Sequence, residues 1–281
     1  MLAVTAVVCG AFVAPLGVTA GSHEYSSIHL LAEVTKDSRV AFRELQTVSF
    51  AGSGAEYVMQ RRIPLAGVSE ITDVVVVDAA TGERLERLEA RRDLDQDLDR
   101  SPDAGRDNAY TVYPEDDDLV IEWYHRSADT QRRWVISYVA HGAVHFSREF
   151  NELTWTVLSG YDAPVRQSVI VVDLPGSAHP NDIQSKLEKD PASIESTKQV
   201  GRGQVSYIVD EAPAGATIAV SIWFPGDLVD RGAFWRWWLG RNSGLVGALL
   251  GAGVAVGVGF ILWRRSGNRR DESEPSSDET V

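Results

Sequence analysis

The stretch IHLLAEVTKDSRVAFRELQTV, residues 28–48, decides the fold class of this chain. Two runs rich in apolar residues, 28–34 and 40–48, flank the polar segment Lys36-Asp37-Ser38. Apolar runs of strand length on either side of a short polar turn are the pattern of a β-hairpin. The sequence therefore predicts two antiparallel, neighbouring strands close to its N-terminus.

The same pattern recurs along the chain as far as residue 224. Further strand-length runs that are apolar or alternate apolar with polar residues are 71–77, 119–124, 133–139, 165–174, 205–209 and 217–224. Two stretches rich in charge, or in Ser and Pro, are expected to be long loops: 84–118 and 176–203. Many short strands separated by turn residues predict a mainly β fold, and specifically an antiparallel β-sandwich.

The composition excludes two classes of protein. The chain has 281 residues, with 27 Lys and Arg against 40 Asp and Glu, a net charge of −13. Nucleic acids are held mainly by clustered Lys and Arg, so we expect no nucleic-acid partner. Eight Trp, eight Tyr and eight Phe exclude a wholly disordered chain.

The N-terminus has the pattern of a secretory signal peptide. Residues 1–20 contain no charged side chain, and the apolar run 2–14 is followed by the helix breaker Pro15-Leu16-Gly17 and by small residues suited to cleavage after Ala20. No Lys or Arg follows Met1 directly, so either the true start lies upstream or the signal is atypical. A buried core helix or an uncleaved anchor is the alternative interpretation of this run. The only Cys, Cys9, lies inside this run, and its removal would leave the exported part without disulfides or thiolate metal sites.

Residues 243–263 predict a transmembrane helix. These 21 residues carry no charge, and at ~1.5 Å per residue they span roughly 31 Å, the thickness of a bilayer core. Trp residues flank the segment on both sides, as they do at membrane interfaces; they are Trp235, Trp237, Trp238 and Trp263. A single-pass protein of the cell membrane follows from this segment and the signal peptide, with the lipid bilayer as one partner.

The two ends also set the expected topology. An exported N-terminal part places the domain 21–228 outside, with a juxtamembrane segment 229–242 and a disordered cytoplasmic tail 264–281. The Arg residues that follow the apolar segment agree with this orientation. Within the segment, glycines recur at a four-residue spacing that brings helices close in membranes; they are Gly247, Gly251, Gly253 and Gly257. This spacing suggests self-association or packing against a multi-span partner.

Few residues suggest catalysis, and no motif of a nucleophile, a phosphate-binding loop or a metal site is complete. His141 and His145 have a four-residue spacing, but Gly142 argues against the helix on which that spacing would bind a metal. Glu149 and Glu152 are candidates for the acid and base of a glycosidase. We expect no enzyme, no cofactor and no metal, with an envelope hydrolase that uses the Glu pair or the His pair as the alternative.

Three stretches together resemble a known family. They are Glu44 in the second predicted strand, then Arg61-Arg62-Ile63-Pro64 before Ile71-Thr72-Asp73-Val74, and Phe150-Asn151-Glu152-Leu153-Thr154-Trp155 leading to Pro164 and 169–175. Over about residues 26–226 they resemble the DUF2207 family, the exported domain of YciQ-like predicted bacterial membrane proteins. The resemblance implies a signal peptide, a β-rich exported domain and a downstream membrane segment. The family has no assigned activity, so no catalytic residue is carried over.

The most specific stretch of the resemblance contains Trp155, for which two interpretations stand. Either Trp155 packs in the core, or it forms the floor of a binding groove with Arg62 and Glu152 at the rim. The leading hypothesis is a non-enzymatic, membrane-anchored envelope protein whose exported domain binds another envelope component, a protein or a glycan. An accessory subunit of a multi-span membrane complex is a further alternative.

Overall fold

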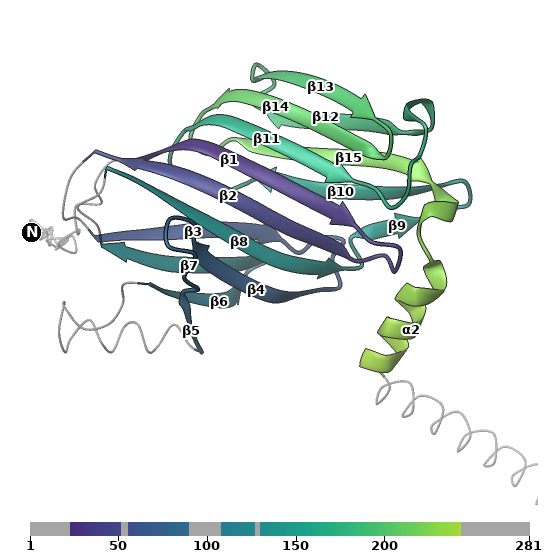
Figure 1. The fold of residues 1–281 in the computed structure, drawn as a ribbon, viewed down its shortest axis with the longest axis horizontal. Coiled ribbons are helices and arrows are strands. Elements are labelled where there is room, and N and C mark those ends of the chain that lie inside the picture. The colour runs from purple at the N-terminus through teal and green to yellow at the C-terminus, as the bar shows by residue number, and fades with distance from the viewer. Residues whose placement is uncertain (1–22, 52–55, 90–107, 127–129, 243–281) are drawn as a thin grey trace, which may run out of the picture. The chain divides into compact units, whose positions relative to one another are not determined.

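The computed structural model describes residues 23–51, 56–89, 108–126 and 130–242. Within these residues the chain forms fifteen strands arranged in three sheets (Figure 1). The predicted signal peptide 1–20, transmembrane segment 243–263 and tail 264–281 lie outside the described residues, and so do the four spaced glycines. The mainly β prediction is confirmed.

The three sheets are named here by their strands. Sheet A has the order β13 (Glu195–Gly201), β14 (Gln204–Ala212), β11 (Val165–Asp173), β1 (His23–Val34), β2 (Val40–Phe50), β8 (Gln131–His141) and β4 (Glu70–Asp78). Sheet B has the order β3 (Glu56–Pro64), β7 (Asp118–Arg126), β6 (Ala109–Glu115) and β5 (Glu86–Leu88). Sheet C has the order β12 (Gln184–Asp190), β15 (Thr217–Pro225), β10 (Phe150–Leu158) and β9 (Val144–Phe146).

The predicted N-terminal hairpin is confirmed as β1 and β2. The strands pair in antiparallel register, with Leu30 opposite Glu44. The backbone N–H of Thr35 donates to the carbonyl of Arg39 at 2.9 Å, which closes the turn. Ser38 takes a positive φ of 67° in this turn, a conformation that tight turns require.

The prediction of a purely antiparallel fold is wrong. β1 pairs with β11 in parallel, and β5 pairs with β6 in parallel. A parallel pair cannot be joined by a tight turn, so its strands meet through a longer connection. Turn residues in a sequence indicate only the pairing of strands that follow one another in the chain. They therefore could not predict the pairing of β1 with β11.

The two predicted long loops are also partly wrong. The stretch 84–118 contains β5 and β6, and the stretch 176–203 contains β12 and β13. β13 is an edge strand of sheet A, and β12 is an edge strand of sheet C. Their residues are mostly polar and exposed (QSKLEKD and ESTKQVG). Edge strands with charged side chains carry little of the apolar alternation that identifies a strand in a sequence.

Sheet A packs against both other sheets. The ring of Phe42 on β2 stacks on Trp155 of β10 at 4.0 Å between centroids, which joins sheets A and C. Trp123 of β7 meets Trp134 of β8 edge to face at 5.9 Å, which joins sheets B and A. One cluster of buried apolar side chains contains residues of all three sheets.

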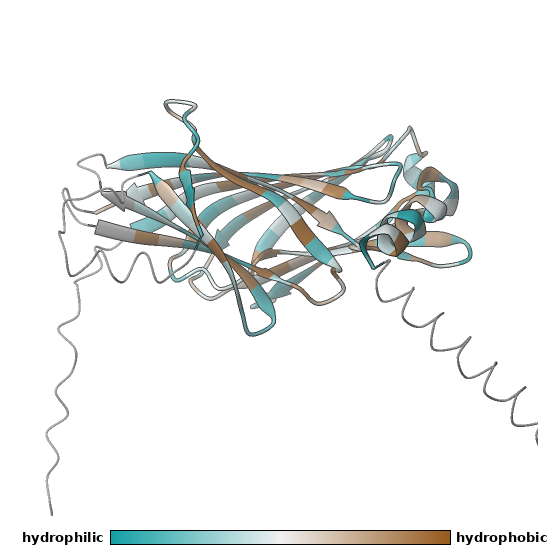
Figure 2. Cartoon of the chain, turned by 90° about the horizontal axis from the view of Figure 1, so that it is seen from below, coloured by the Kyte–Doolittle hydropathy of each residue, from teal (hydrophilic) through white to brown (hydrophobic). Residues whose placement is uncertain are grey.

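Side chains alternate between the core and the outer faces of the sheets. Hydrophobic and hydrophilic residues follow one another along the strands in Figure 2. On β10, for example, Leu153 and Trp155 are buried, whereas Thr154 between them is exposed. This period of two decides which sequence-predicted residues share a face.

The last described element is the helix α2 (Arg231–Arg241). The chain divides after Asp230 into a unit that holds the three sheets and a second unit that begins with this helix. Within the described part of the chain, none of the helices has both the length and the apolar character needed to cross a membrane.

Candidate functional site

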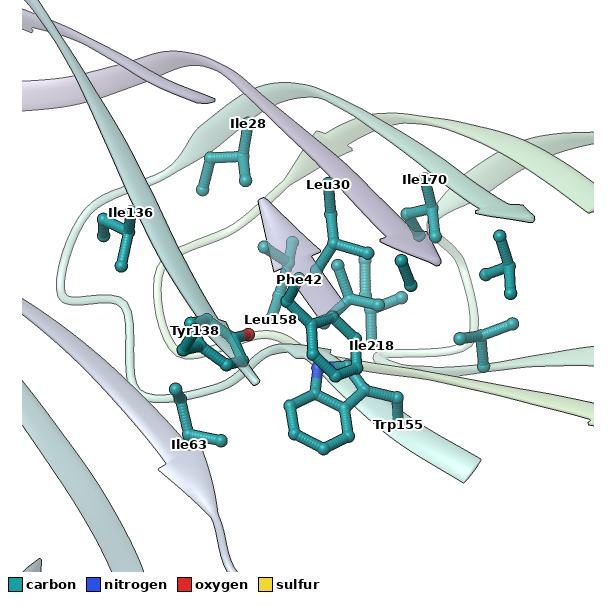
Figure 3. Packing of buried hydrophobic residues seen from close by; sticks show 14 of the residues in the cluster. Ile28, Leu30, Phe42, Ile63, Ile136, Tyr138, Trp155, Leu158, Ile170 and Ile218 are labelled. Carbon is teal, nitrogen blue, oxygen red and sulfur yellow. The ribbon is translucent and has the colours of Figure 1, made fainter. Parts of the chain in front are cut away.

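The structure separates the three residues of the predicted groove. Trp155 points into the core, is 3 % exposed, and stacks on Phe42 (Figure 3). Glu152 lies three positions earlier on β10 and therefore points to the opposite face of that strand. Trp155 and Glu152 consequently do not line one groove, and core packing is the role that the structure shows for Trp155.

Arg62 lies on the outer face of sheet B, where its charge is compensated. Its guanidinium bonds to Glu115 and lies 3.8 Å from a carboxylate oxygen of Asp118. Gly160, at a φ of 69°, passes so close that an added Cβ would lie 2.8 Å from Cδ of Arg62. Two carboxylates and a turn thus hold Arg62 in place.

Glu152 instead belongs to a row of side chains on the outer face of sheet C. In the strand register, Gln184 of β12 lies opposite Trp223 of β15, and Trp223 lies opposite Glu152 of β10. His145 of β9 lies on the other side of Glu152. We call these four residues the outer row. With strands about 4.8 Å apart, the row extends over roughly 14 Å.

The outer row combines one large aromatic ring with three polar groups. Trp223 and Glu152 are half-buried, and Gln184 and His145 are exposed. None of the hydrogen bonds among the described residues involves the side chain of Trp223, Gln184 or His145. An indole N–H, a carboxamide and an imidazole are therefore available for a ligand.

Thr154, Ser221 and Lys186 form a second row beside the outer row. Thr154 Oγ1 donates to a carboxylate oxygen of Glu152 at 3.2 Å and lies 3.0 Å from Ser221 Oγ on the neighbouring strand. Lys186, opposite Ser221, bonds to Glu188 at 2.5 Å. The bond from Thr154 orients the carboxylate of Glu152 on the surface beside Trp223.

Trp223 is the residue that the sequence reasoning missed. The predicted strand 217–224 is confirmed as β15. Ile218, Val220, Ile222 and Phe224 are the buried residues of one phase of the alternation. Trp223 lies in the other phase, and an aromatic residue out of phase with the buried face of a strand must point outward. That signal was present in the sequence.

The two histidines differ in environment. His141 at the end of β8 is only 8 % exposed, and its Nε2 lies 3.2 Å from Thr72 Oγ1. Burial lowers the pKa of His141, although the carboxylate of Glu70 opposes the shift. His145 is exposed, in the outer row. Among the described residues no cluster of three His, Cys, Asp or Glu side chains could hold a metal.

Glu149 lies apart from the strands. It belongs to the segment between β9 and β10, and its carbonyl accepts a hydrogen bond from the N–H of Gly226 at 3.3 Å. Glu152, its proposed partner in acid–base catalysis, lies within β10 beside His145 instead.

A buried ionic network lies where the three sheets meet. Nε of Arg61 on β3 lies 3.0 and 2.9 Å from the two carboxylate oxygens of Glu44 on β2, and both side chains are fully buried. Tyr138 Oη of β8 donates to Glu44 at 2.6 Å, and Arg61 donates to the carbonyl of Thr156 on β10 at 3.2 Å. Arg61 thereby connects all three sheets.

The titration of this network reflects its burial. Burial disfavours the charged form of Arg61, but the adjacent Glu44 carboxylate outweighs it and raises the pKa of the guanidinium. Burial, together with the negative charge of Glu44, raises the pKa of Tyr138 well above its usual value. These shifts keep Arg61 charged and Tyr138 protonated, as their hydrogen bonds require. The network is closed to solvent, so we assign it a structural role.

A hollow of about 660 Å³ lies at one end of sheet A, away from the residues singled out in the sequence. Its lining consists of Arg166, Pro191, Ser193, Ile194, Glu195, Asp210, Glu211 and Pro213. Arg166 bonds through two nitrogens to Glu24, at 3.0 and 2.8 Å.

The comparisons with solved structures find distant similarities. A candidate protease from Parabacteroides distasonis ATCC 8503 is 11 % identical with a TM-score of 0.39, over 74 % of this chain and 41 % of the other. A candidate nutrient-binding protein from Legionella pneumophila is 11 % identical with a TM-score of 0.41, over 73 % and 68 %. An M1 zinc metallopeptidase from Deinococcus radiodurans is 9 % identical with a TM-score of 0.32, over 72 % and 42 %. With such scores these similarities bear on no functional argument.

The family comparison is decisive. No curated protein matches the chain. The model of the N-terminal domain of the predicted membrane proteins called DUF2207 matches residues 24–224, which are most of the chain and include all fifteen described strands except the ends of β1 and β15. The resemblance found in the sequence is confirmed, and the chain belongs to the DUF2207 family.

Proposed function

We propose that this chain is a membrane-anchored protein of the bacterial envelope whose exported β-sandwich domain binds another envelope component without catalysing a reaction. In this proposal residues 1–20 direct export, the domain 21–228 lies outside, and residues 243–263 anchor it with the C-terminus in the cytoplasm. The description of the family as predicted membrane proteins supports the membrane part.

The outer row is the observation that carries the binding part. It places the half-buried ring of Trp223 between Gln184 and Glu152, with His145 beyond. Binding sites commonly combine an aromatic surface with a few polar groups that fix the orientation of the ligand. A sugar ring suits this row, because its C–H face packs on indole while its hydroxyls bond to carboxylate, amide and imidazole. We therefore propose an envelope glycan as the bound component.

The experiment measures binding of the full-length protein, in detergent micelles, to an array of purified bacterial polysaccharides. Replacement of Trp223 by Ala is expected to weaken binding at least about thirtyfold, the loss typical of a central aromatic contact. Ile208→Ala is the matched control, because Ile208 is an exposed apolar residue on the outer face of sheet A. Equal binding by wild type and a correctly folded Trp223→Ala variant would contradict the proposal.

A protein partner is the other outcome of this test. A photo-crosslinking amino acid in place of Gln184, which is exposed at the end of the row, would report it in cells. Crosslinking to one protein, abolished by Trp223→Ala, together with no binding on the array, would replace the glycan by a protein ligand and leave the binding surface unchanged.

One observation favours the envelope hydrolase as a second candidate. Glu152 and His145 are neighbours across two strands, and a carboxylate beside an imidazole can act as acid and base. Incubation of the same polysaccharides with the protein would then release new reducing ends. Release by the wild type that Glu152→Gln abolishes would establish this candidate, and binding without release would oppose it.

A further inference from the structure

The helix α2 has a composition unlike the rest of the chain. Its eleven residues, RGAFWRWWLGR, include three Arg and no acidic residue, in a chain whose net charge is −13. They also include four aromatic residues, Phe234, Trp235, Trp237 and Trp238. Such a local cluster of positive charge and Trp in an acidic protein indicates that this helix has a different environment from the rest of the chain.

The Arg residues are spread around the whole helix, whereas the four aromatic residues lie on one half of it, with Arg231 and Arg241 among them. The Arg residues follow one another at intervals of five, so successive guanidinium groups point about 140° apart around the axis. The aromatic rings lie against one another, Trp235 with Trp238 at 5.9 Å and Phe234 with Trp237 at 6.0 Å between centroids. None of the helix residues is buried. The helix therefore has no purely apolar face that could pack on a protein surface.

Two large apolar side chains of α2 are exposed. Trp235 is 56 % exposed and Leu239 is 46 % exposed, and Figure 2 shows hydrophobic and hydrophilic residues intermixed on this helix. Water is a poor solvent for such a cluster. The headgroup layer of a bilayer accommodates Trp rings and Arg side chains at the same depth. That layer suits a helix on which Arg side chains lie among aromatic rings.

The sequence that follows points to the same surrounding. α2 ends at Arg241, and the 21 uncharged residues 243–263 begin two positions later. At ~1.5 Å per residue, α2 is about 16 Å long. A chain that enters the hydrocarbon core at residue 243 must pass through the headgroup layer over the residues just before it.

We infer that α2 is a membrane-interface helix that binds anionic phospholipid headgroups through Arg231, Arg236 and Arg241, with its aromatic residues at headgroup depth. The inference rests on the membrane anchoring in the proposed function, but not on the outer row or its ligand. Phosphate groups of anionic lipids complement the three guanidinium groups, which favour bidentate contacts with phosphate. The helix would thereby hold the segment between the exported domain and the membrane anchor at a defined depth in the headgroup layer.

The first experiment measures depth. Full-length protein with Cys9→Ser and a spin label at Trp235→Cys is reconstituted in nanodiscs of phosphatidylcholine with phosphatidylglycerol. Collision of the label with membrane-soluble oxygen and water-soluble nickel complexes reports its depth. The label at position 235 is expected at headgroup depth, whereas a control label at the exposed turn residue Ala214→Cys is expected in water. Equal accessibility to nickel at both positions would overturn the inference.

The second experiment measures lipid preference. The enrichment of spin-labelled phosphatidylglycerol over phosphatidylcholine around the protein is compared between the wild type and a variant with Arg231, Arg236 and Arg241 replaced by Gln. One Arg near an anionic surface corresponds to about a fivefold preference. We expect a preference of at least that size in the wild type and none in the variant. An unchanged preference in the variant would overturn the role of the three Arg.

These outcomes separate the inference from the proposed function. Protein that fails to enter nanodiscs at all would contradict the membrane anchor and, with it, the inference. Protein that enters with the label at position 235 in water would contradict only the inference. The Trp223→Ala variant is expected to keep the depth and lipid preference of the wild type, since Trp223 lies in β15 and not in α2.

Discussion

Replacing Arg61 by Met is expected to destabilise the β-domain by about 3–5 kcal/mol, the cost of leaving one partner of a buried ion pair without the other. Both side chains of the pair are fully buried, and the Glu44 carboxylate would stay in the core without a cation. Tyr138 would still donate to Glu44 at 2.6 Å, which limits the loss. The bond from Arg61 to the carbonyl of Thr156, which connects sheets B and C, would disappear as well.

The double variant tests whether the charge itself is the cause. Combining Glu44→Leu with Arg61→Met removes both buried charges, and apolar replacements of buried ion pairs are often neutral or stabilising. We expect the double variant to recover at least about 1 kcal/mol of unfolding free energy relative to Arg61→Met alone.

Urea unfolding of the full-length protein in detergent, followed by near-ultraviolet circular dichroism of the buried aromatic residues, gives the free energies of unfolding. The control is Arg62→Met, because Arg62 pairs with carboxylates at the partly exposed surface and is expected to cost at most about 1 kcal/mol. A cost of Arg61→Met no greater than that of this control would contradict the expected penalty for an unpaired buried carboxylate. A double variant less stable than Arg61→Met would contradict it as well.

Three further predictions concern separate parts of the chain. Trp155→Ala is expected to cost about 3–5 kcal/mol of unfolding free energy, because it leaves a cavity in the core. Trp223→Ala leaves no such cavity and is expected to cost under about 1.5 kcal/mol. Equal costs would contradict the assignment of the two Trp residues to opposite faces of sheet C. The lowered pKa of His141 means that the unfolded chain binds the proton more strongly, so stability is present above the unfolded pKa of 6.5 and falls as the pH drops below it. His141→Gln should flatten this part of the measured profile of unfolding free energy against pH, and an identical profile would exclude His141 as its cause. Gly251→Leu should disperse a complex formed through the predicted transmembrane segment, which sedimentation in detergent detects; an unchanged complex would count against packing at the spaced glycines.

The sequence predicted eight of the fifteen described strands, including the N-terminal hairpin. Strand alternation and turn residues act over a few positions, so they can be recognised locally. The polar edge strands β12 and β13 were missed for the same reason, because their residues satisfy backbone pairing without showing apolar alternation. The parallel pairing of β1 with β11 depends on contacts between distant parts of the chain, which no local pattern encodes.

The candidate site shows the same division. Of the residues singled out from the sequence, Glu152 and His145 lie in the outer row. Of the two interpretations of Trp155, core packing is the one that the structure shows, because strand alternation places its side chain among buried residues. Trp223 reaches Glu152 only through the pairing of β10 with β15.

Strand periodicity was enough to predict a β-rich domain, and the uncharged segment 243–263 was enough to predict a membrane anchor. The family was indicated by three short stretches that resemble DUF2207, and the family comparison confirmed it. These properties depend on residues that are near one another in the chain, and hydrophobicity and turn geometry express them directly. The tertiary structure alone decided that Arg61 joins three sheets and that Gln184, Trp223, Glu152 and His145 form one row. The physical reason is that sheet register and core packing bring together residues that are far apart in the chain, and both are set by the fold as a whole.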